Sequence, residues 1–229
     1  MVEMSEHAAS TGRTVDWGFV RARLGSFLAV VPLSFWVINH LWRNLSAFRG
    51  SQAWTEDVTT YSHPLAFFVS STVALLPLAL HTVWGISRIA STRPNKLPFF
   101  SNVKYVLQRL SAIGLLLFLG AHLWLAMLQP RLMTQRPEAF TDIAHEMHYH
   151  GPTLVVYVLG VLGISYHLAN GLSTFAMGWG LVSSRRALRK FDIVTWVVFA
   201  LLLVLGLGAV YALWSAGGEL PAVMPHASH

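Results

Sequence analysis

Five long segments of this chain contain no charged residue, although its 229 residues include 16 Lys and Arg and 10 Asp and Glu. A helix needs about 20 mostly apolar residues to cross the hydrocarbon core of a bilayer. The segments show none of the apolar–polar alternation over about 10 residues that marks a membrane β-strand. We therefore predict an all-α membrane protein, a bundle of five transmembrane helices within residues 24–42, 58–87, 110–130, 147–184 and 193–218.

The composition excludes several other classes of protein. The chain is 54% hydrophobic and 11% charged, whereas a soluble domain carries about a quarter charged residues. This apolar content also excludes a disordered chain. Without cysteine the chain has no disulfide, no thiolate metal site and no covalently attached c-type haem. The net charge of +6 is spread over loops, so we expect no nucleic-acid partner.

The basic residues predict the orientation of the chain in the membrane. Twelve of the 16 Lys and Arg lie before the first segment or in the loops after the second and fourth. Because cytoplasmic loops carry the excess of basic residues, the N-terminus is expected in the cytoplasm and the C-terminus outside. The predicted parts are a cytoplasmic segment 1–23 with no cleaved signal peptide, a transmembrane domain 24–218 and an exposed tail 219–229.

Four histidines lie inside the predicted helices, one in each of the first four. Ionisable residues within a membrane span are costly and usually functional. At 1.5 Å per residue, His40 and His122 lie about 5 and 12 Å from the outer boundary. His81 and His167 lie about 27 and 24 Å from it. The depths therefore predict a shallow pair, His40 with His122, and a deep pair, His81 with His167. A single buried histidine would more often donate a hydrogen bond to a neighbouring helix.

Two opposed imidazoles at one depth are the axial ligands that six-coordinate haem b requires. Gly85, Gly163 and Gly171 lie one turn from a deep histidine and would let a flat macrocycle approach the backbone, although glycine also serves ordinary helix packing. Zinc or copper transport is the competing interpretation. A bare ion normally recruits carboxylate, thiolate or thioether ligands, and no segment contains Asp or Glu. We favour two stacked haem b groups.

Four stretches of the chain carry a more specific pattern: RLGSFLAVVPLSFWVINHLWRN, LPLALHTVWGI, LQRLSAIGLLLFLGAHLW and GVLGISYHLANGLSTFAMGWG. In these the chain resembles the cytochrome b membrane-anchor subunit of succinate:quinone oxidoreductases of the five-helix, two-haem kind. The resemblance implies that His40 and His122 bind the iron of the outer, distal haem. It implies that His81 and His167 bind the iron of the proximal haem near the cytoplasm.

The resemblance also implies partners that supply the remaining chemistry. A flavoprotein subunit with FAD would oxidise succinate, and an iron–sulfur subunit would pass the electrons on. This chain has neither cysteine nor a glycine-rich phosphate loop to hold those groups. It would be the membrane anchor of a succinate dehydrogenase (respiratory complex II of the tricarboxylic acid cycle) in a bacterial inner membrane. It would carry electrons through the proximal and then the distal haem to menaquinone, without any catalytic residue of the succinate site.

Haem propionates are anions that bind basic or hydroxyl groups. The candidates lie near the cytoplasmic helix ends, where each could equally set topology or cap a helix: Arg23, Ser26, Gln108, Arg109 and Ser111.

A quinone needs a hydrogen-bond donor and a proton carrier near the distal haem. One outer group of candidates is Glu56, Asp57, Tyr61 and His63, and the other is His145, Glu146, His148 and His150. Solvated interfacial histidines are the plainer interpretation of the second group. A third position lies on the cytoplasmic face near Trp17 and Arg21.

Ser165 departs from one pattern of the family. Some of its fumarate reductases have an intramembrane glutamate at this position, two residues before the fourth-helix histidine, for compensating proton transfer. The serine favours succinate oxidation. The alternatives are the anchor of a quinol:fumarate reductase, the cytochrome b anchor of a hydrogenase or formate dehydrogenase, and a metal or proton transporter.

Overall fold

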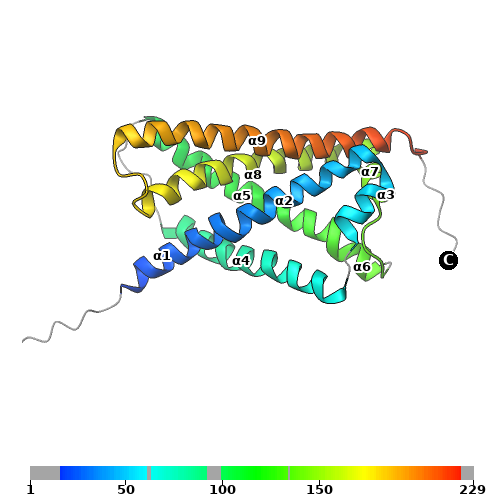
Figure 1. The fold of residues 1–229 in the computed structure, drawn as a ribbon, viewed down its shortest axis with the longest axis horizontal. Helices are drawn as coiled ribbons and strands as arrows, with labels where there is room; N and C mark the ends of the chain where they lie inside the picture. Colours follow the sequence, from blue (N-terminus) through cyan, green and yellow to red (C-terminus); the bar gives the residue numbers. More distant parts are fainter. Residues whose placement is uncertain (1–15, 61–62, 92–98, 134, 223–229) are drawn as a thin grey trace, which may run out of the picture.

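Helices make up all the regular structure of the described residues (Figure 1). The computed structural model describes residues 16–60, 63–91, 99–133 and 135–222, and no strand occurs within these ranges. Five helical segments are long and apolar enough to cross a membrane, and each overlaps one predicted segment. They are Trp17–Arg49, Leu65–Arg88, Val103–Met133, Gly151–Gly178 and Arg185–Gly217. The prediction of an all-α protein with five transmembrane helices is therefore confirmed.

The first span is a composite of several helical pieces. Helix α1 (Trp17–Leu28) begins at Asp16, whose carboxylate accepts a hydrogen bond from the Phe19 amide at 3.1 Å. A π-helical turn (Ala29–Leu33) contains Pro32 and leads into α2 (Ser34–Asn44). Proline lacks an N–H group, and a wider turn accommodates its ring within a continuous span. A 3₁₀ turn (Leu45–Arg49), the short α3 (Ser51–Trp54) and a second π turn (Thr55–Thr59) follow.

The other spans are longer single helices with short additions. Helix α4 covers Pro64–Ser91, α8 covers Gly151–Gly178 and α9 covers Arg185–Gly217. Helix α5 (Phe99–Leu123) continues through a π turn (Trp124–Leu128) into α6 (Gln129–Met133). A short helix, α7 (Phe140–Tyr149), precedes α8.

Helices α8 and α9 pack through small side chains. Ser165 and Ala169 are buried on α8. On α9, Gly206 lies against Val161, and a Cβ atom there would overlap the valine side chain. Small residues let membrane helices approach closely and gain van der Waals contact where lipid offers no hydrophobic driving force. Helices α8 and α9 are therefore closely packed against each other.

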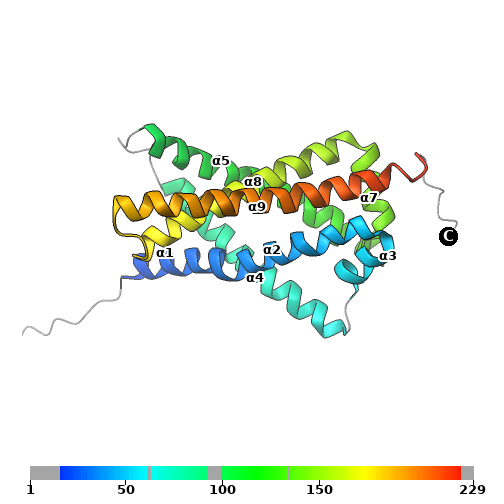
Figure 2. The same cartoon turned by 45° about the horizontal axis from the view of Figure 1, so that its top comes forward.

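The two ends of the bundle differ in construction. Helices α1 and α9 begin at the same end, which we call the basic end (Figure 1). Helices α3 and α7 lie with the last turns of α9 at the opposite end, which we call the capped end, in both views (Figure 2). There Trp54, Phe140 and Met147 form a core with Leu213 of α9. The Trp54 indole N–H donates to Asn44 Oδ1 at 3.1 Å and ties α3 to α2.

The outer surface of the long helices is apolar. Val83, Leu117 and Val204 expose 70%, 72% and 69% of their surface. Exposed apolar surface of this extent is unfavourable in water and matches the lipid-facing side of a membrane bundle. Which end of the bundle faces the cytoplasm stays a prediction from the basic residues.

Candidate functional site

The structure brings the four intramembrane histidines together in the two predicted pairs. At the capped end, His40 of α2 faces His122 of α5, with ring centres 5.9 Å apart and planes crossed at 73°. Trp36 stacks on His40 at 4.8 Å, and Phe118 stacks on His122 at 5.4 Å. Both imidazoles of this capped-end pair are therefore supported by an aromatic ring from the preceding turn of the same helix.

A residue of helix α8 contacts the Nδ1 atom of His122. The Nδ1 atom of His122 lies 3.1 Å from the Tyr157 hydroxyl oxygen. Tyr157 also meets the edge of Phe118, with ring centres 5.5 Å apart and planes at 88°. Gly160 makes room for Phe118, because a Cβ atom at that position would overlap the phenyl ring. The contact orients the His122 ring through its Nδ1 atom. The Nε2 atom is then the ring nitrogen that stays available for another partner.

The second pair lies nearer the basic end. His81 of α4 and His167 of α8 have ring centres 6.2 Å apart and planes crossed at 72°. His81 Nδ1 lies 3.1 Å from the backbone carbonyl of Gly25 on α1. Gly25 is buried, and a Cβ atom there would overlap the Trp84 indole. The glycine therefore allows α1 to approach α4 closely enough for its carbonyl to reach the imidazole.

Polar side chains of α5 surround His167. Its Nδ1 atom lies 3.3 Å from Ser111 Oγ and 3.3 Å from Gln108 Nε2. The Ser111 hydroxyl donates to the Gln108 carbonyl at 3.0 Å, so its oxygen can accept a proton from His167 Nδ1. The Gln108 amide donates to the His167 carbonyl at 3.1 Å and accepts from Asn170 at 2.8 Å. Gln108 thereby joins α5 to two successive turns of α8.

Both pairs fit a metal that lies between two imidazoles. Metal–imidazole bonds are about 2 Å long, so two rings on opposite sides of one metal have centres about 6 Å apart. Metal-bound histidines usually hold Nδ1 in a hydrogen bond and coordinate through Nε2. Three of the four rings have such an Nδ1 contact. Within the described residues, no three His, Cys, Asp or Glu side chains could hold an ion together.

The propionate candidates Arg23 and Ser26 lie where α1 meets the end of α8. Ser26 Oγ accepts from the Trp179 indole at 3.1 Å and donates to the Arg23 carbonyl at 2.9 Å. The Arg23 guanidinium lies 4.6 Å from the centre of the Phe19 ring. A hollow of about 510 Å³ opens between Arg23, Phe27 and Trp179.

Arg109, another propionate candidate, contacts Tyr105, a residue that the sequence did not predict for this region. Its guanidinium carbon lies 3.4 Å from the centre of the Tyr105 ring. The Tyr105 hydroxyl is buried and has no hydrogen-bond partner among the described residues. A buried hydroxyl without a partner, on a ring that a guanidinium covers, is suited to an anionic group.

The three glycines near the deep histidines lie in different surroundings. A Cβ atom at Gly85 would meet nothing within 4 Å. At Gly163 it would lie 3.6 Å from Leu115, and at Gly171 it would lie 3.7 Å from the Gln108 amide. Gly85 therefore borders open space, whereas Gly163 and Gly171 lie at the packed α5–α8 contact.

The first group of quinone candidates is engaged in surface contacts at the capped end. Asp57 pairs with Arg49 at 2.5 Å, and Glu56 accepts a hydrogen bond from Gln52 at 3.0 Å. His63 Nδ1 accepts from the Leu65 amide at 3.1 Å and so caps the start of α4. Tyr61 lies outside the described residues.

The second group divides into two structural roles. His145 Nε2 lies 3.0 Å from the Ala222 carbonyl, and His148 Nδ1 lies 2.8 Å from the Trp214 carbonyl. These two histidines hold α7 against the end of α9 and the residues after it. Glu146 forms a separate cluster, 3.4 Å from His150 and 3.2 Å from Thr153 Oγ1. At the opposite end, Trp17 and Arg21 are both exposed.

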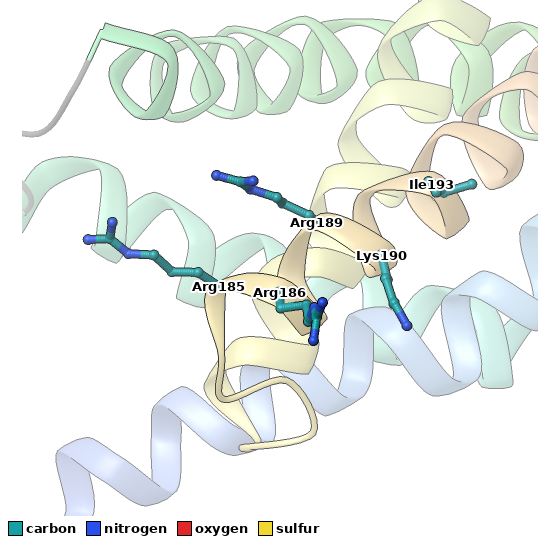
Figure 3. A pocket seen from close by; sticks show the side chains of 5 residues that line it. All are labelled: Arg185, Arg186, Arg189, Lys190 and Ile193. Carbon is teal, nitrogen blue, oxygen red and sulfur yellow. The ribbon is translucent and has the colours of Figure 1, made fainter.

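A strongly basic hollow lies at the start of α9 (Figure 3). It has a volume of about 560 Å³ and is lined by Arg185, Arg186, Arg189, Lys190 and Ile193. Figure 3 shows Arg185 and Arg189 projecting to one side of the helix and Lys190 to the other. None of the four cations forms an ion pair with a described residue.

Sequence reasoning missed the side chains that support the histidines. Trp36 and Phe118 each lie four residues before a paired histidine, and this i, i+4 spacing could have revealed their stacking. Tyr157 had no comparable signal, because it meets His122 only through the packing of α8 on α5.

Five membrane-spanning helices with two internal histidine pairs define a polytopic helical membrane protein. Residues 100–206 match the family described as succinate dehydrogenase/fumarate reductase transmembrane subunit. Over 198 residues the chain is 31% identical to the succinate dehydrogenase cytochrome b558 subunit of Bacillus subtilis (strain 168), across 85% of this chain and 96% of that protein. No solved structure matches the chain. The chain belongs to this family and is the membrane subunit of a succinate dehydrogenase/fumarate reductase complex.

Proposed function

We propose that this chain is the membrane anchor and electron-transfer subunit of a succinate:menaquinone oxidoreductase in a bacterial inner membrane. The observation that carries the proposal is the pair of crossed imidazole contacts, with ring centres 5.9 and 6.2 Å apart, inside the bundle. The printed name of the Bacillus subtilis relative, cytochrome b558, supports haem b as the group that lies between the rings.

Two haem b groups would use the four histidines as their axial ligands. His40 and His122 would hold the distal haem, and His81 and His167 the proximal haem. When bound, haem supplies one-electron transfer between the iron–sulfur subunit and the quinone. The chain's own residues orient three of the four imidazoles through Gly25, Ser111 and Tyr157, and Trp36 stacks on the fourth, His40. Arg109 and the Tyr105 hydroxyl, which has no partner among the described residues, are suited to a propionate at the basic end, as are Arg23 and Ser26.

Membership in the family implies that a flavoprotein and an iron–sulfur subunit complete the complex. We place them on the basic end, because the excess of Lys and Arg predicts that this end is cytoplasmic. Arg185, Arg186, Arg189 and Lys190 have no ion pair among the described residues and offer an anionic subunit an electrostatic docking surface there.

Ser165 supports succinate oxidation as the direction of catalysis. It is fully buried, and its hydroxyl has no partner within the described part of the chain. No carboxylate stands at this place to carry a compensating proton. Electron transfer from the cytoplasmic side outward would then respond to the membrane potential, at about 2.3 kcal/mol per charge per 100 mV.

The capped end is the proposed location of the menaquinone site. Glu146, His150 and Thr153 form a hydrogen-bonded cluster of exchangeable groups there. The group around Asp57 is less suited, since its carboxylate is paired with Arg49. Glu146 is accordingly the residue that we assign to proton exchange with the quinone.

Succinate-driven reduction of the purified complex tests the proposed function. Under anaerobic conditions, succinate should reduce a b-type haem in the optical spectrum, and a menaquinone analogue should reoxidise it. A complex whose haem is reduced by dithionite but neither by succinate nor by menaquinol would contradict the assignment to this electron path.

Replacing Glu146 tests the quinone site. Glu146→Gln should lower the menaquinone reductase rate by about 10²-fold, the usual scale of a lost proton-transfer group, while succinate still reduces the haems. Asp57→Asn is the matched control, because it changes a carboxylate at the same end and should leave the rate unchanged. If Glu146→Gln kept the same menaquinone reductase rate as Asp57→Asn, Glu146 would not belong to the quinone site.

A further inference from the structure

Tyr157 is the one described side chain that contacts a ring nitrogen of the capped-end histidine pair. Its hydroxyl oxygen lies 3.1 Å from His122 Nδ1. The ring of the other member, His40, stacks on Trp36 and has no hydrogen-bond partner among the described residues. Among the described residues, hydrogen bonding to this pair therefore depends on the Tyr157 hydroxyl.

The contact has a defined direction when a metal occupies the pair. An imidazole that coordinates through Nε2 carries its proton on Nδ1, so Nδ1 donates and the Tyr157 oxygen accepts. Donation of this proton makes the imidazole a more basic ligand. A more basic axial ligand favours the oxidised iron over the reduced iron and thereby lowers the reduction potential.

The surroundings of Tyr157 make the contact rigid. Its ring meets His122 at 78° and Phe118 at 88°, with ring centres 5.5 Å away in both cases. It also packs against the apolar core at the capped end that includes Met147 and Leu213. The hydroxyl is therefore held in place by three sets of contacts.

We propose that Tyr157 is a positioning residue that fixes the orientation of His122 and lowers the reduction potential of the haem held between His40 and His122. This inference rests on the proposed function, because it requires haem at that pair. It goes beyond ligation, because it assigns the setting of one potential to a residue that does not touch the iron.

The basic-end pair has different acceptors and provides an internal reference. His81 contacts a backbone carbonyl of α1, and His167 contacts Ser111 of α5. Neither contact involves Tyr157. A change at Tyr157 should therefore alter one haem and leave the other as it was.

Tyr157→Phe in the intact complex tests the proposal, followed by a potentiometric titration of the haem absorbance. The substitution removes the acceptor oxygen and keeps the aromatic packing. Tyr211→Phe is the matched control. Tyr211 lies near the C-terminal end of α9, is 58% exposed and packs on Phe48. The component absent from His122→Ala identifies the haem of the capped-end pair.

The expected result is an upward shift in the midpoint potential of that component alone, with the Tyr211→Phe titration superimposed on that of the unmodified complex. Loss of haem confined to the capped-end pair also supports the positioning role. Unshifted potentials, equal shifts in both components, or loss of both haems would overturn the inference. A complex that lacks haem before any substitution would instead overturn the proposed function, so the two failures are distinguishable.

Discussion

The two histidine pairs have nearly the same geometry but different supports. Their ring centres are 5.9 and 6.2 Å apart, and their planes cross at 73° and 72°. Both rings of the basic-end pair have Nδ1 contacts, to Gly25 and to Ser111. In the capped-end pair only His122 has one, and aromatic stacking on Trp36 and Phe118 supplies the rest. Nearly the same ring geometry therefore occurs with two hydrogen bonds between helices in one pair, and with one such bond and two aromatic stacks in the other.

This difference implies that the pairs respond separately to substitution. The basic-end pair depends on a close approach of α1 to α4 and on the polar contacts between α5 and α8. The capped-end pair depends on α8 through Tyr157 and on the neighbouring aromatic rings. Changes in one set of contacts should leave the other haem largely intact.

Removing a ligand should have the largest effect on this comparison. His81→Ala is expected to abolish the proximal haem, and His122→Ala the distal haem, because each leaves an iron with one protein ligand. Pyridine-haemochrome quantification of the purified complex should fall from two haems to one in either variant. His63→Ala, at the exposed start of α4, should retain both. Loss of the same spectral component in both variants would show that the pairs are assigned wrongly.

Gly25→Ala should disturb the basic-end pair through the backbone. The new Cβ atom would overlap the Trp84 indole, and overpacking of this kind costs about 1–3 kcal/mol. As α1 moves away from α4, its carbonyl leaves His81 Nδ1. We expect a lower thermal midpoint and a shift in the proximal haem component. Gly151→Ala is the control, because a Cβ atom there would meet nothing within 4 Å, and it should change neither the thermal midpoint nor the haem spectrum. The same thermal midpoint and proximal-haem spectrum in the two variants would refute the role given to Gly25.

Ser111→Ala should have the smallest of these effects. The substitution removes the hydroxyl beside His167 Nδ1, while the Gln108 amide keeps its bond to the His167 carbonyl. Loss of such an outer contact typically weakens metal binding about 10-fold or more. Haem transfer to apomyoglobin should therefore be faster for the proximal haem than in the unmodified complex. Thr195→Ala, whose hydroxyl bonds its own helix on α9, serves as control. Faster loss of the distal haem would contradict the separation of the two pairs.

The sequence predicted much of this arrangement because the governing signals are local. The absence of charge over 24–42 or 193–218 specifies a membrane span without reference to any other residue. The rise per residue of a helix sets the depth of His40, His81, His122 and His167, and depth alone predicted how they pair.

The contacts that the sequence could not predict depend on rotation and close approach between helices. Nothing local to Gly25 indicates that its carbonyl faces His81, 56 residues away. The outer candidates illustrate the same limit. His145 and His148 occur beside Glu146 in the sequence, yet they bond carbonyls at the end of α9 and beyond, while Glu146 bonds Thr153. Spacing along α7 cannot distinguish these roles.

The number of haems per chain tests the central claim most directly. Pyridine-haemochrome analysis of the purified complex, with protein determined by amino-acid analysis, should give two b haems for each copy of this chain. A redox titration should resolve them into two components. A value of one would show that one histidine pair is only a contact between helices, and a value of zero would contradict the account as a whole.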